Sequence, residues 1–590
     1  MLDTPEPWAR FDDLVAGTAV RFSGLRQVLM AHRIDQVAPV LDEVDRLTRD
    51  GLWAFGFLSY EAAPGLDPTL TTHTPVDGLP LVWFGLVDRP EQVPPLPATG
   101  PTVPPLAWTP DWDATTHHTA VEQVRTHIAA GQTYQTNLTT RLTAHAPTDL
   151  DPTDLYRELV HAQRGAHNAY LHLGDHTIAS ASPELFFEQR GDRILMRPMK
   201  GTAARGRTTT EDATALARLR GSTKERAENI MIVDLVRNDL GRIAAPGSVQ
   251  ATRLLAAERY ETVHQLTSDV HARLPPDTGL TDTFRALFPC GSVTGAPKPR
   301  TMELIHHLEP GPRGVYCGTI GIVGPPTAKV RARFSVAIRT VLHDHTRRQL
   351  SYGTGGGITW SSRPAAEHAE LQAKAQVLSI RHEPFELLET LHHTPHGLHH
   401  LDAHLTRMTD SAHYFGYTFD PTAARTLLHD RLREIEQARV RLRCARDGTL
   451  DLDIEAAPTP LSHPVRLVID PHPIDTKTCW TRHKTTRRTP YDTRLARHPT
   501  ADDVVIINER GEITETCTAN LAAHLDGHWW TPPLHSGCLP GIERAHLITT
   551  GHLRERTLHP DDLTRADDLA LINSLRGTRP AQLLDSPAAP

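Results

Sequence analysis

An α+β fold class is predicted by two observations on the sequence. Short apolar runs, separated by breaks rich in proline and glycine, recur over residues 1–110 and again over 313–360, which is typical of strands. Segments with helical apolar spacing lie between and after them, at 211–243 and 364–380. A new strand pattern begins after residue 381. We therefore expect three parts, covering residues 1–110, 111–380 and 381–590.

Composition limits the classes of function. The chain has 590 residues, 39% of them hydrophobic, which indicates a soluble globular protein with several domains. The net charge of −8 argues against a nucleic-acid partner, and no apolar run approaches the ~20 residues needed to cross a membrane. The first residues, MLDTPEPWARFDD, lack the apolar core of a secretory signal. The six cysteines form no C-x-x-C pair, so we expect neither a disulfide framework nor a cysteine zinc site, and a cytoplasmic location.

Histidines are most frequent in HHTPHGLHHLDAH, residues 392–404. His396, His400 and His404 have the i, i+4 spacing of one helical face, which is one way to bind zinc. Pro395 and Gly397 indicate a turn, however, so a single helix cannot carry all three. We therefore do not predict a metal site on this spacing.

Two pairs of glutamates share helical faces. Glu225 and Glu228 are i, i+3 in TKERAENIMIVDLVRNDLGR, and Glu367 and Glu370 repeat the spacing in PAAEHAELQAKA. Facing one another, the four carboxylates would form an oxygen-only site for Mg²⁺. The alternative is four solvated glutamates on the surface. If only one of the pairs were present, this alternative would be favoured.

A lysine, an arginine and a glycine run accompany these helices. Lys200 follows a predicted strand in RILMRPMKGTAARG, directly before Gly201, where the chain must turn. The segment SYGTGGGITW, 351–360, contains glycines that would let backbone N–H groups approach an anion. Arg339, expected on a neighbouring strand, can grip a carboxylate with two hydrogen bonds. A solvated lysine and an ordinary glycine turn are the alternatives.

Seven motifs in a fixed order resolve these alternatives. They are SPELFF, RPMKGTAARG, KERAENIMIVDLVRNDLGRI, FPCGSVTGAPKPRTMELI, RGVYCGTIGIV, FSVAIRT and GTGGGITW followed by AEHAELQAKA, all within 182–378. Together they resemble the chorismate-utilising enzymes, and among these the component I family of aminodeoxychorismate synthases. The resemblance implies a β-rich sandwich with helices.

The resemblance also implies how the substrate is held. Mg²⁺ bound by the glutamates at 225, 228, 367 and 370 would hold the ring carboxylate of chorismate. The residues implied for the enolpyruvyl carboxylate and its pocket are Arg339, Tyr316, Thr294, Gly355, Gly356 and Gly357.

At the position of Lys200, anthranilate synthases have a small residue. In aminodeoxychorismate synthases this lysine is proposed to attack C2 of chorismate, and Glu184 would protonate the departing 4-hydroxyl as a general acid. Two departures from the wider family matter. Gln135 stands where isochorismate and salicylate synthases have a lysine base, which argues against water as the nucleophile. The histidine of anthranilate synthases corresponds to Gln265, with His264 beside it, and the role of this pair stays open.

The part after residue 381 has its own lysine motif. CWTRHKTTRRTPYDTRLA, RGEITETCTANLAAHLDGHWWTPPLHSGCLPGIERAHL and LDAHLTRMTDSAHYFGY resemble the fold-type IV enzymes that use pyridoxal 5′-phosphate (PLP). The resemblance implies an α/β domain in which Lys484 binds PLP covalently and Glu515 pairs with its pyridine nitrogen. Arg407, the backbone at Ile542, and Thr518 would bind the phosphate. It is also compatible with a homodimer through this domain.

We therefore expect a bifunctional enzyme. Residues 1–380 would convert chorismate and ammonia to 4-amino-4-deoxychorismate, and 381–590 would release pyruvate and 4-aminobenzoate. No glutaminase motif surrounds any cysteine, so ammonia would come from a separate glutamine amidotransferase subunit or from solution. Three alternatives remain: an anthranilate synthase with a PLP appendage, a synthase fused to an active aminotransferase, and an inactive sensor of chorismate or PLP.

Overall fold

A computed structural model describes residues 6–100, 102–380, 383–459 and 462–584, and they form two compact units. The first unit comprises Met1–Ala204 and Leu216–Glu383, and the second comprises Arg205–Ala215 and Pro384–Pro590. The expected mixed class of helices and strands is confirmed. Within the described residues, no helix is both long and apolar enough to span a membrane.

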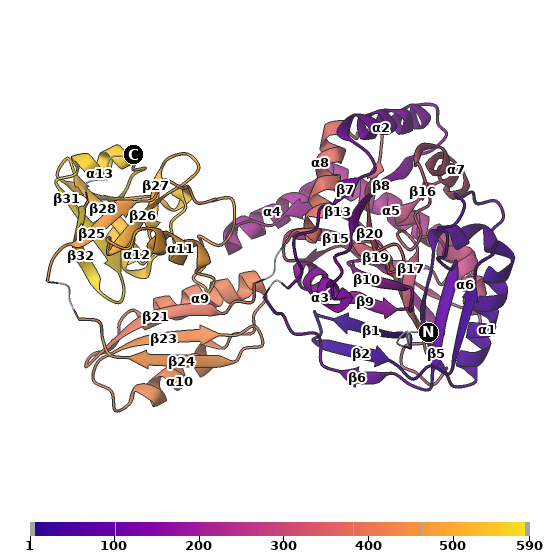
Figure 1. The fold of residues 1–590 in the computed structure, drawn as a ribbon, viewed down its shortest axis with the longest axis horizontal. Coiled ribbons are helices and arrows are strands. Elements are labelled where there is room, and N and C mark those ends of the chain that lie inside the picture. The colour runs from indigo at the N-terminus through magenta and orange to yellow at the C-terminus, as the bar shows by residue number, and fades with distance from the viewer. Residues whose placement is uncertain (1–5, 101, 381–382, 460–461, 585–590) are drawn as a thin grey trace. The chain divides into compact units, whose positions relative to one another are not determined.

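The first unit contains two large sheets, each built from strands of both expected parts, 1–110 and 111–380 (Figure 1). One has the order β16 (Gly295–Ala296), β8 (Gln135–His145), β20 (Gln349–Ile358), β19 (Thr340–Asp344), β10 (His176–Ser182), β9 (His167–His172), β1 (Trp8–Asp13), β2 (Thr18–Phe22) and β6 (Glu91–Val93), with β7 (Thr109–Pro110) beside β8. The other has the order β13 (Met199–Ala204), β15 (Val263–Arg273), β12 (Arg193–Arg197), β11 (Leu185–Arg190), β18 (Ala332–Val336), β17 (Thr319–Val323), β4 (Trp53–Leu58), β5 (Val82–Val87) and β3 (Gln27–Ala31), with β14 (Gln250–Arg259) beside β15.

These sheets pack face to face, and strand alternation explains how. In β4, Phe55 and Phe57 point into an aromatic core that also contains Phe22 of the opposite sheet. Ala54 and Leu58, the residues of opposite parity, belong to a second core on the outer face. A strand buried on both faces reads as the continuous apolar run WAFGFL rather than an alternating one.

Helices cover the outer faces of the sandwich. The helices that contribute to the outer core or lie over the sheets are α1 (Val37–Arg49), α2 (Ala114–Ala129), α3 (Pro152–Gln163), α5 (Thr223–Gly241), α6 (Leu280–Leu287), α7 (Lys298–Leu308) and α8 (Pro364–Ala375). Helices α2 and α8 lie side by side (Figure 1). α5 packs against β13 and β15, and α8 packs against β20, so these helices border the strands that carry the motifs. Helix α4 (Thr209–Gly221) spans the boundary between the two units in sequence.

The second unit has two sheets of its own. A small antiparallel sheet has the order β22 (Gly397–Leu398), β21 (Leu387–Thr394), β23 (Ala438–Cys444) and β24 (Leu450–Glu455). A larger mixed sheet has the order β27 (Ile513–Thr516), β26 (Asp503–Ile507), β25 (Val465–Ile469), β32 (Gly577–Leu583), β31 (Asp568–Asn573), β28 (Asn520–Leu525), β29 (His528–Thr531) and β30 (Arg554–Glu555).

Each of these sheets packs against helices. α9 (Leu401–Phe415) and α10 (Pro421–Leu432) bury Leu405, Met408 and Leu428 against the small sheet. α11 (Thr489–Arg497), α12 (Ile542–Thr549) and α13 (Pro560–Arg565) accompany the larger one. As the turn residues predicted, α9 begins only after the 392–400 segment, so the three spaced histidines do not share a helix.

Candidate active sites

A cavity of about 160 Å³ in the first unit is lined by residues from all seven motifs. The predicted residues that line it are Glu184, Lys200, Glu225, Glu228, Tyr316, Arg339, Gly355, Gly356, Gly357, Glu367 and Glu370. They come from β13, β20, α5 and α8 and from the connections before β11, β17 and β19. The structure therefore brings together residues that are up to 186 positions apart in the sequence, from 184 to 370.

Lys200 points from β13 toward the glycine run on β20. A β carbon added to Gly357 would lie 2.6 Å from Lys200 Nζ and 2.4 Å from Gln135 Nε2, so the ends of both side chains meet over this glycine. Gln135 Nε2 is buried and makes no hydrogen bond within the described chain. Glycine at 357 is thus required by close approach rather than by a turn.

Burial shifts the pKa of both groups that are predicted to react. The pKa of Lys200 is lowered by burial and by the ammonium group of Lys374, although Glu228, Glu370 and Glu184 oppose the change. Burial raises the pKa of Glu184 to about 7. Glu184 is 3% exposed and its Oε1 has no hydrogen-bond partner among the described residues. The cavity thus favours a neutral amine and a carboxylic acid that keeps its proton near neutrality.

The four glutamates lie on the two helices that flank the cavity. Burial, and the neighbouring Glu228, raise the pKa of Glu225; burial also raises the pKa of Glu367. Among the described residues, no three of these side chains bring their oxygens within 4.8 Å of one another. Mg²⁺ keeps several water ligands and needs only one or two carboxylates, so this oxygen-only set fits it chemically without a tighter cluster.

Arg339 lies in the connection between β18 and β19, not on a strand as expected, and has the left-handed φ of 51°. Its guanidinium is buried and donates a hydrogen bond to Gln163 Oε1, a neutral group. Within the described chain it forms no ion pair, which leaves its charge available to an anion. Thr294, in contrast, does not line the cavity: its hydroxyl is fully buried and donates to the Cys290 carbonyl at 3.2 Å.

Sequence reasoning missed several polar residues of this cavity, among them Lys374, and left the role of Gln265 open. Lys374 Nζ lies 2.9 Å from Glu370 Oε1 and donates to the Gly355 carbonyl at 2.8 Å. An i, i+4 Glu–Lys pair usually reads as a surface ion pair, so no signal distinguished it. Gln265 also lines the cavity; its Nε2 donates to Thr202 Oγ1 at 3.4 Å, and its Oε1 is buried with no hydrogen bond inside the described ranges.

A second cavity, of about 510 Å³, lies in the second unit. All five residues predicted to bind the cofactor line it, namely Arg407, Lys484, Glu515, Thr518 and Ile542. Lys484 lies in the loop after β25, where its carbonyl accepts a hydrogen bond from Leu388 N at 3.1 Å. Burial, and the nearby cation Arg407, lower the pKa of Lys484 to about 8.

Glu515, on β27, accepts hydrogen bonds from three donors. They are Leu539 N at 3.0 Å, Tyr491 Oη at 3.2 Å and Asn520 Nδ2 at 3.4 Å. Burial nevertheless raises the pKa of Glu515 to about 7. A protonated ring nitrogen beside this buried carboxyl would provide a positive charge in direct contact with it. The Glu515 carboxyl therefore fits a partner of this kind.

Arg407 lies on α9 and faces the same cavity, but much of its charge is already paired. Arg407 Nε and Nη2 donate to Glu389 at 2.8 and 2.6 Å, and Nη1 donates to the Pro540 carbonyl at 3.0 Å. Although burial opposes it, Arg407 and His404 lower the pKa of Glu389 to about 2. The guanidinium is thus fixed in orientation and keeps two unused N–H groups for a phosphate.

Ile542 is the first residue of α12, where backbone N–H groups have no partner within the helix. At its N-cap, Gly541, a β carbon would lie 1.9 Å from Asn520 Oδ1, so any larger residue would displace the Asn520 side chain. Thr518 Oγ1 donates to Asp503 Oδ2 at 2.5 Å, so this hydroxyl proton is already used. The N-terminus of α12 and Arg407 therefore line the same cavity.

Comparison with known proteins identifies two families along the chain. The sequence model of the chorismate binding enzymes matches residues 1–379, and that of the class IV amino-transferases matches 386–584. The chain therefore belongs to the chorismate-binding enzyme family and carries a class IV aminotransferase domain after it.

Individual relatives match less than half of this chain. An aminodeoxychorismate synthase of Streptomyces griseus is 46% identical over 259 residues, which is 44% of this chain and 35% of that protein. An anthranilate synthase component 1 of Streptomyces coelicolor is 39% identical over 276 residues, covering 46% of this chain and 52% of the relative. The chain thus spans between about a third and about half of these relatives. The crystal structure of anthranilate synthase component I from Streptococcus pneumoniae covers 64% of this chain and 94% of its own, with a TM-score of 0.53 and 23% identity, which shows the fold.

Proposed function

We propose that the first unit converts chorismate and ammonia to 4-amino-4-deoxychorismate, and that the second releases pyruvate from it to give 4-aminobenzoate. The observation that carries the first half is Lys200, whose amine and the Glu184 carboxyl line one cavity with pKa values shifted toward the neutral forms. Anthranilate formation needs no lysine nucleophile at this position. The match to an anthranilate synthase keeps that reaction as the second candidate.

In the proposed reaction the neutral Lys200 amine forms a bond to C2 of chorismate. The ring double bonds shift, the C4–O bond breaks, and the hydroxyl leaves as water with the proton of Glu184. Ammonia then attacks C4, the double bonds shift back, and the bond to Lys200 breaks. The covalent adduct divides one difficult displacement into two easier ones, and the proton from Glu184 lets the poorly leaving hydroxyl depart as water.

Positioning would come from the rest of the cavity. The Arg339 guanidinium and the backbone N–H groups near Gly356 would hold the enolpyruvyl carboxylate, with Tyr316 beside them. Thr294 would not contact the substrate. Its hydroxyl would only fix the main chain of the turn from Cys290. Mg²⁺, when bound, supplies positive charge to the ring carboxylate. The residues that would hold it are Glu225, Glu228, Glu367 and Glu370.

In the second unit, Lys484 would bind PLP and move the proton from C4 of the substrate ring, because a pKa of about 8 leaves part of the amine free at neutral pH. PLP, when bound, supplies an electron sink. Glu515 would hold the pyridine nitrogen. The N-terminus of α12 and Arg407 would hold the phosphate, with Thr518 at the rim, and the C3–O bond would break as enolpyruvate leaves and the ring becomes aromatic.

We also propose a glutamine amidotransferase subunit as the source of ammonia, a cytoplasmic location, and a homodimer through the second unit. The deciding experiment supplies the pure protein with chorismate and ammonium, with and without PLP, and separates the products by chromatography and mass. The proposal predicts aminodeoxychorismate without PLP and 4-aminobenzoate with it. Anthranilate as the product would overturn it, and aminodeoxychorismate that PLP does not convert would overturn its second half.

A further inference from the structure

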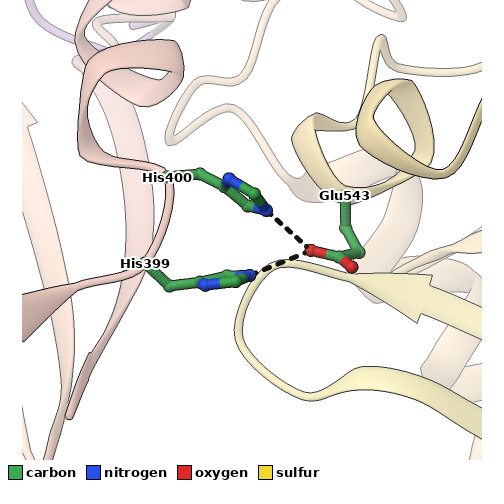
Figure 2. Close-up of side chains that lie close together, drawn as sticks. All are labelled: His399, His400 and Glu543. Atoms are coloured by element: carbon green, nitrogen blue, oxygen red, sulfur yellow. Dashed lines mark hydrogen bonds and ion pairs between the residues drawn. The ribbon is translucent and has the colours of Figure 1, made fainter. Parts of the chain in front are cut away.

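Three side chains that could bind a metal ion meet in the second unit, and none of them lines either cavity. Figure 2 shows the rings of His399 and His400 directed at one carboxylate oxygen of Glu543. His399 Nε2 lies 3.1 Å and His400 Nε2 lies 3.2 Å from Glu543 Oε2. All three atoms lie within 4.8 Å of one another.

The backbone is arranged so that two consecutive residues share this direction. His400, which directly precedes α9, has the left-handed φ of 51°, and its ring centroid lies 3.8 Å from that of His399. This conformation is unfavourable for a non-glycine residue and is enriched at functional sites. The third group, Glu543, comes from α12 and lies 144 positions after His399 in the sequence, so the cluster joins two distant elements.

The spacing suits a tetrahedral ion. Ligands about 2.0–2.1 Å from a tetrahedral zinc ion lie roughly 3.3–3.4 Å apart, close to the two observed nitrogen–oxygen distances. His400 Nε2 is shielded from solvent and makes no well-directed hydrogen bond within the described residues, although it lies 3.2 Å from the Glu543 carboxylate, so it is placed to share an ion with that oxygen. Imidazole nitrogen and carboxylate oxygen are the donors that zinc and its neighbours in the first transition row accept.

A third histidine flanks the cluster. His546 lies on α12 one turn after Glu543, and its ring centroid is 4.8 Å from that of His400. Its ring nitrogens are not among the ligand atoms that lie within 4.8 Å of one another, so His546 shields the site rather than completing the cluster. Because Glu543 immediately follows Ile542, an ion here would also fix the first turn of α12.

We propose that His399, His400 and Glu543 form a binding site for a divalent transition-metal ion of the zinc class, with water as the fourth ligand. This site is separate from the magnesium site of the proposed function, uses no residue of the reacting machinery, and holds whether or not that function is correct. The alternative is a proton shared between imidazole and carboxylate, with no metal.

The test measures metal binding directly. The full chain is stripped with a chelator and titrated with Co²⁺, whose visible absorption reports tetrahedral nitrogen and oxygen ligands, and with Zn²⁺ by calorimetry and elemental analysis. We expect one tight equivalent in the parent. His400→Asn, which tolerates the left-handed backbone, and Glu543→Gln, which keeps the size of the side chain, should each weaken it at least ~10-fold.

His396→Asn is the matched control, because His396 is exposed in the turn just before the cluster. The His396→Asn variant should bind one metal ion per chain as tightly as the parent does. Equal affinity and stoichiometry in the parent, His400→Asn and Glu543→Gln would overturn the proposal, since the binding would then come from other histidines. Circular dichroism of each variant checks that the fold is kept, and His399→Asn provides a second ligand variant if one of the others unfolds.

Discussion

Lys200 Nζ and the backbone of Gly357 lie so close that a single methyl group between them would be only 2.6 Å from the amine. The Lys200 amine therefore contacts the glycine run on β20. Lys200 is half-buried, and an amine confined in this way would lose few rotamers if it reacts as we propose, which favours a nucleophile.

The first prediction tests this contact. Gly357→Ala should push aside the ends of Lys200 and Gln135, which are flexible, and so reduce kcat by ~10²-fold with little loss of stability. Gly355→Ala is the contrasting variant, because its β carbon would lie 2.5 Å from the Leu138 carbonyl, which is main chain. It should lower the free energy of unfolding by about 1–3 kcal/mol. Thermal unfolding and ammonia-dependent turnover measure both, and a fully active Gly357→Ala would contradict the contact.

Removing the amine itself gives the second prediction. Lys200→Ala should lower aminodeoxychorismate formation by ~10²-fold or more, because the residues of a catalytic unit act together. Lys329→Ala, an exposed lysine of the same unit, should leave the rate unchanged. The Lys200 variant should still convert supplied aminodeoxychorismate to 4-aminobenzoate. If the Lys200→Ala variant aminated chorismate at the normal rate, covalent catalysis by this lysine would be excluded.

The pH dependence of the first reaction is the third prediction. Glu184, with a pKa of about 7, is protonated below that pH and loses its proton above it, so the rate should fall on the alkaline side. Lys200 must be neutral, which gives an acidic limb below its lowered pKa. Glu184→Gln should be slower by ~10²-fold or more and should lack the alkaline limb. Rates are measured at a constant concentration of free ammonia, and an alkaline limb retained in the variant would assign it to another group.

Magnesium removal is the fourth prediction. Glu228→Gln and Glu370→Gln should each abolish chorismate turnover and leave the absorbance of bound PLP intact, because the two cavities share no residue. Glu122→Gln, an exposed glutamate on α2, is the control. Excess chelator should stop the wild-type reaction and added Mg²⁺ should restore it; full activity with the chelator present would rule the ion out.

The second lysine gives the fifth prediction. Lys484→Ala should lose the absorbance of covalently bound PLP, consume chorismate normally and accumulate aminodeoxychorismate. Mixing it with Lys200→Ala should restore 4-aminobenzoate, because the intermediate can diffuse between chains. Release of 4-aminobenzoate by Lys484→Ala alone, at the normal rate, would remove the second active site from the proposal.

Local patterns predicted much of both sites, because each pattern carries its own geometry. The i, i+3 spacing placed Glu225 with Glu228, and Glu367 with Glu370, on their helices, and the ordered motifs placed these helices beside Lys200. Both cavities are lined by nearly all the side chains predicted for them. The chemical roles of these residues stay predictions.

Contacts between distant segments were beyond the reach of such patterns. The pairing of Arg407 with Glu389, 18 positions earlier, depends on how α9 packs on β21. The direction of the Thr294 hydroxyl depends on the short turn from Cys290. Likewise, the pair His399–His400 meets Glu543 only through the tertiary fold, so the i, i+4 spacing of histidines in the sequence could not indicate this grouping.

Lys374 gives the first cavity an internal counter-ion. Its ammonium neutralises Glu370 and is anchored by the Gly355 carbonyl, and Lys224 lies 3.7 Å from Glu228 in the same way. A divalent cation that binds these glutamates must therefore compete with tethered ammonium groups, and each one it releases becomes available to a carboxylate on the substrate. Cation and anionic substrate would then enter as reciprocal effectors, each tightening the binding of the other.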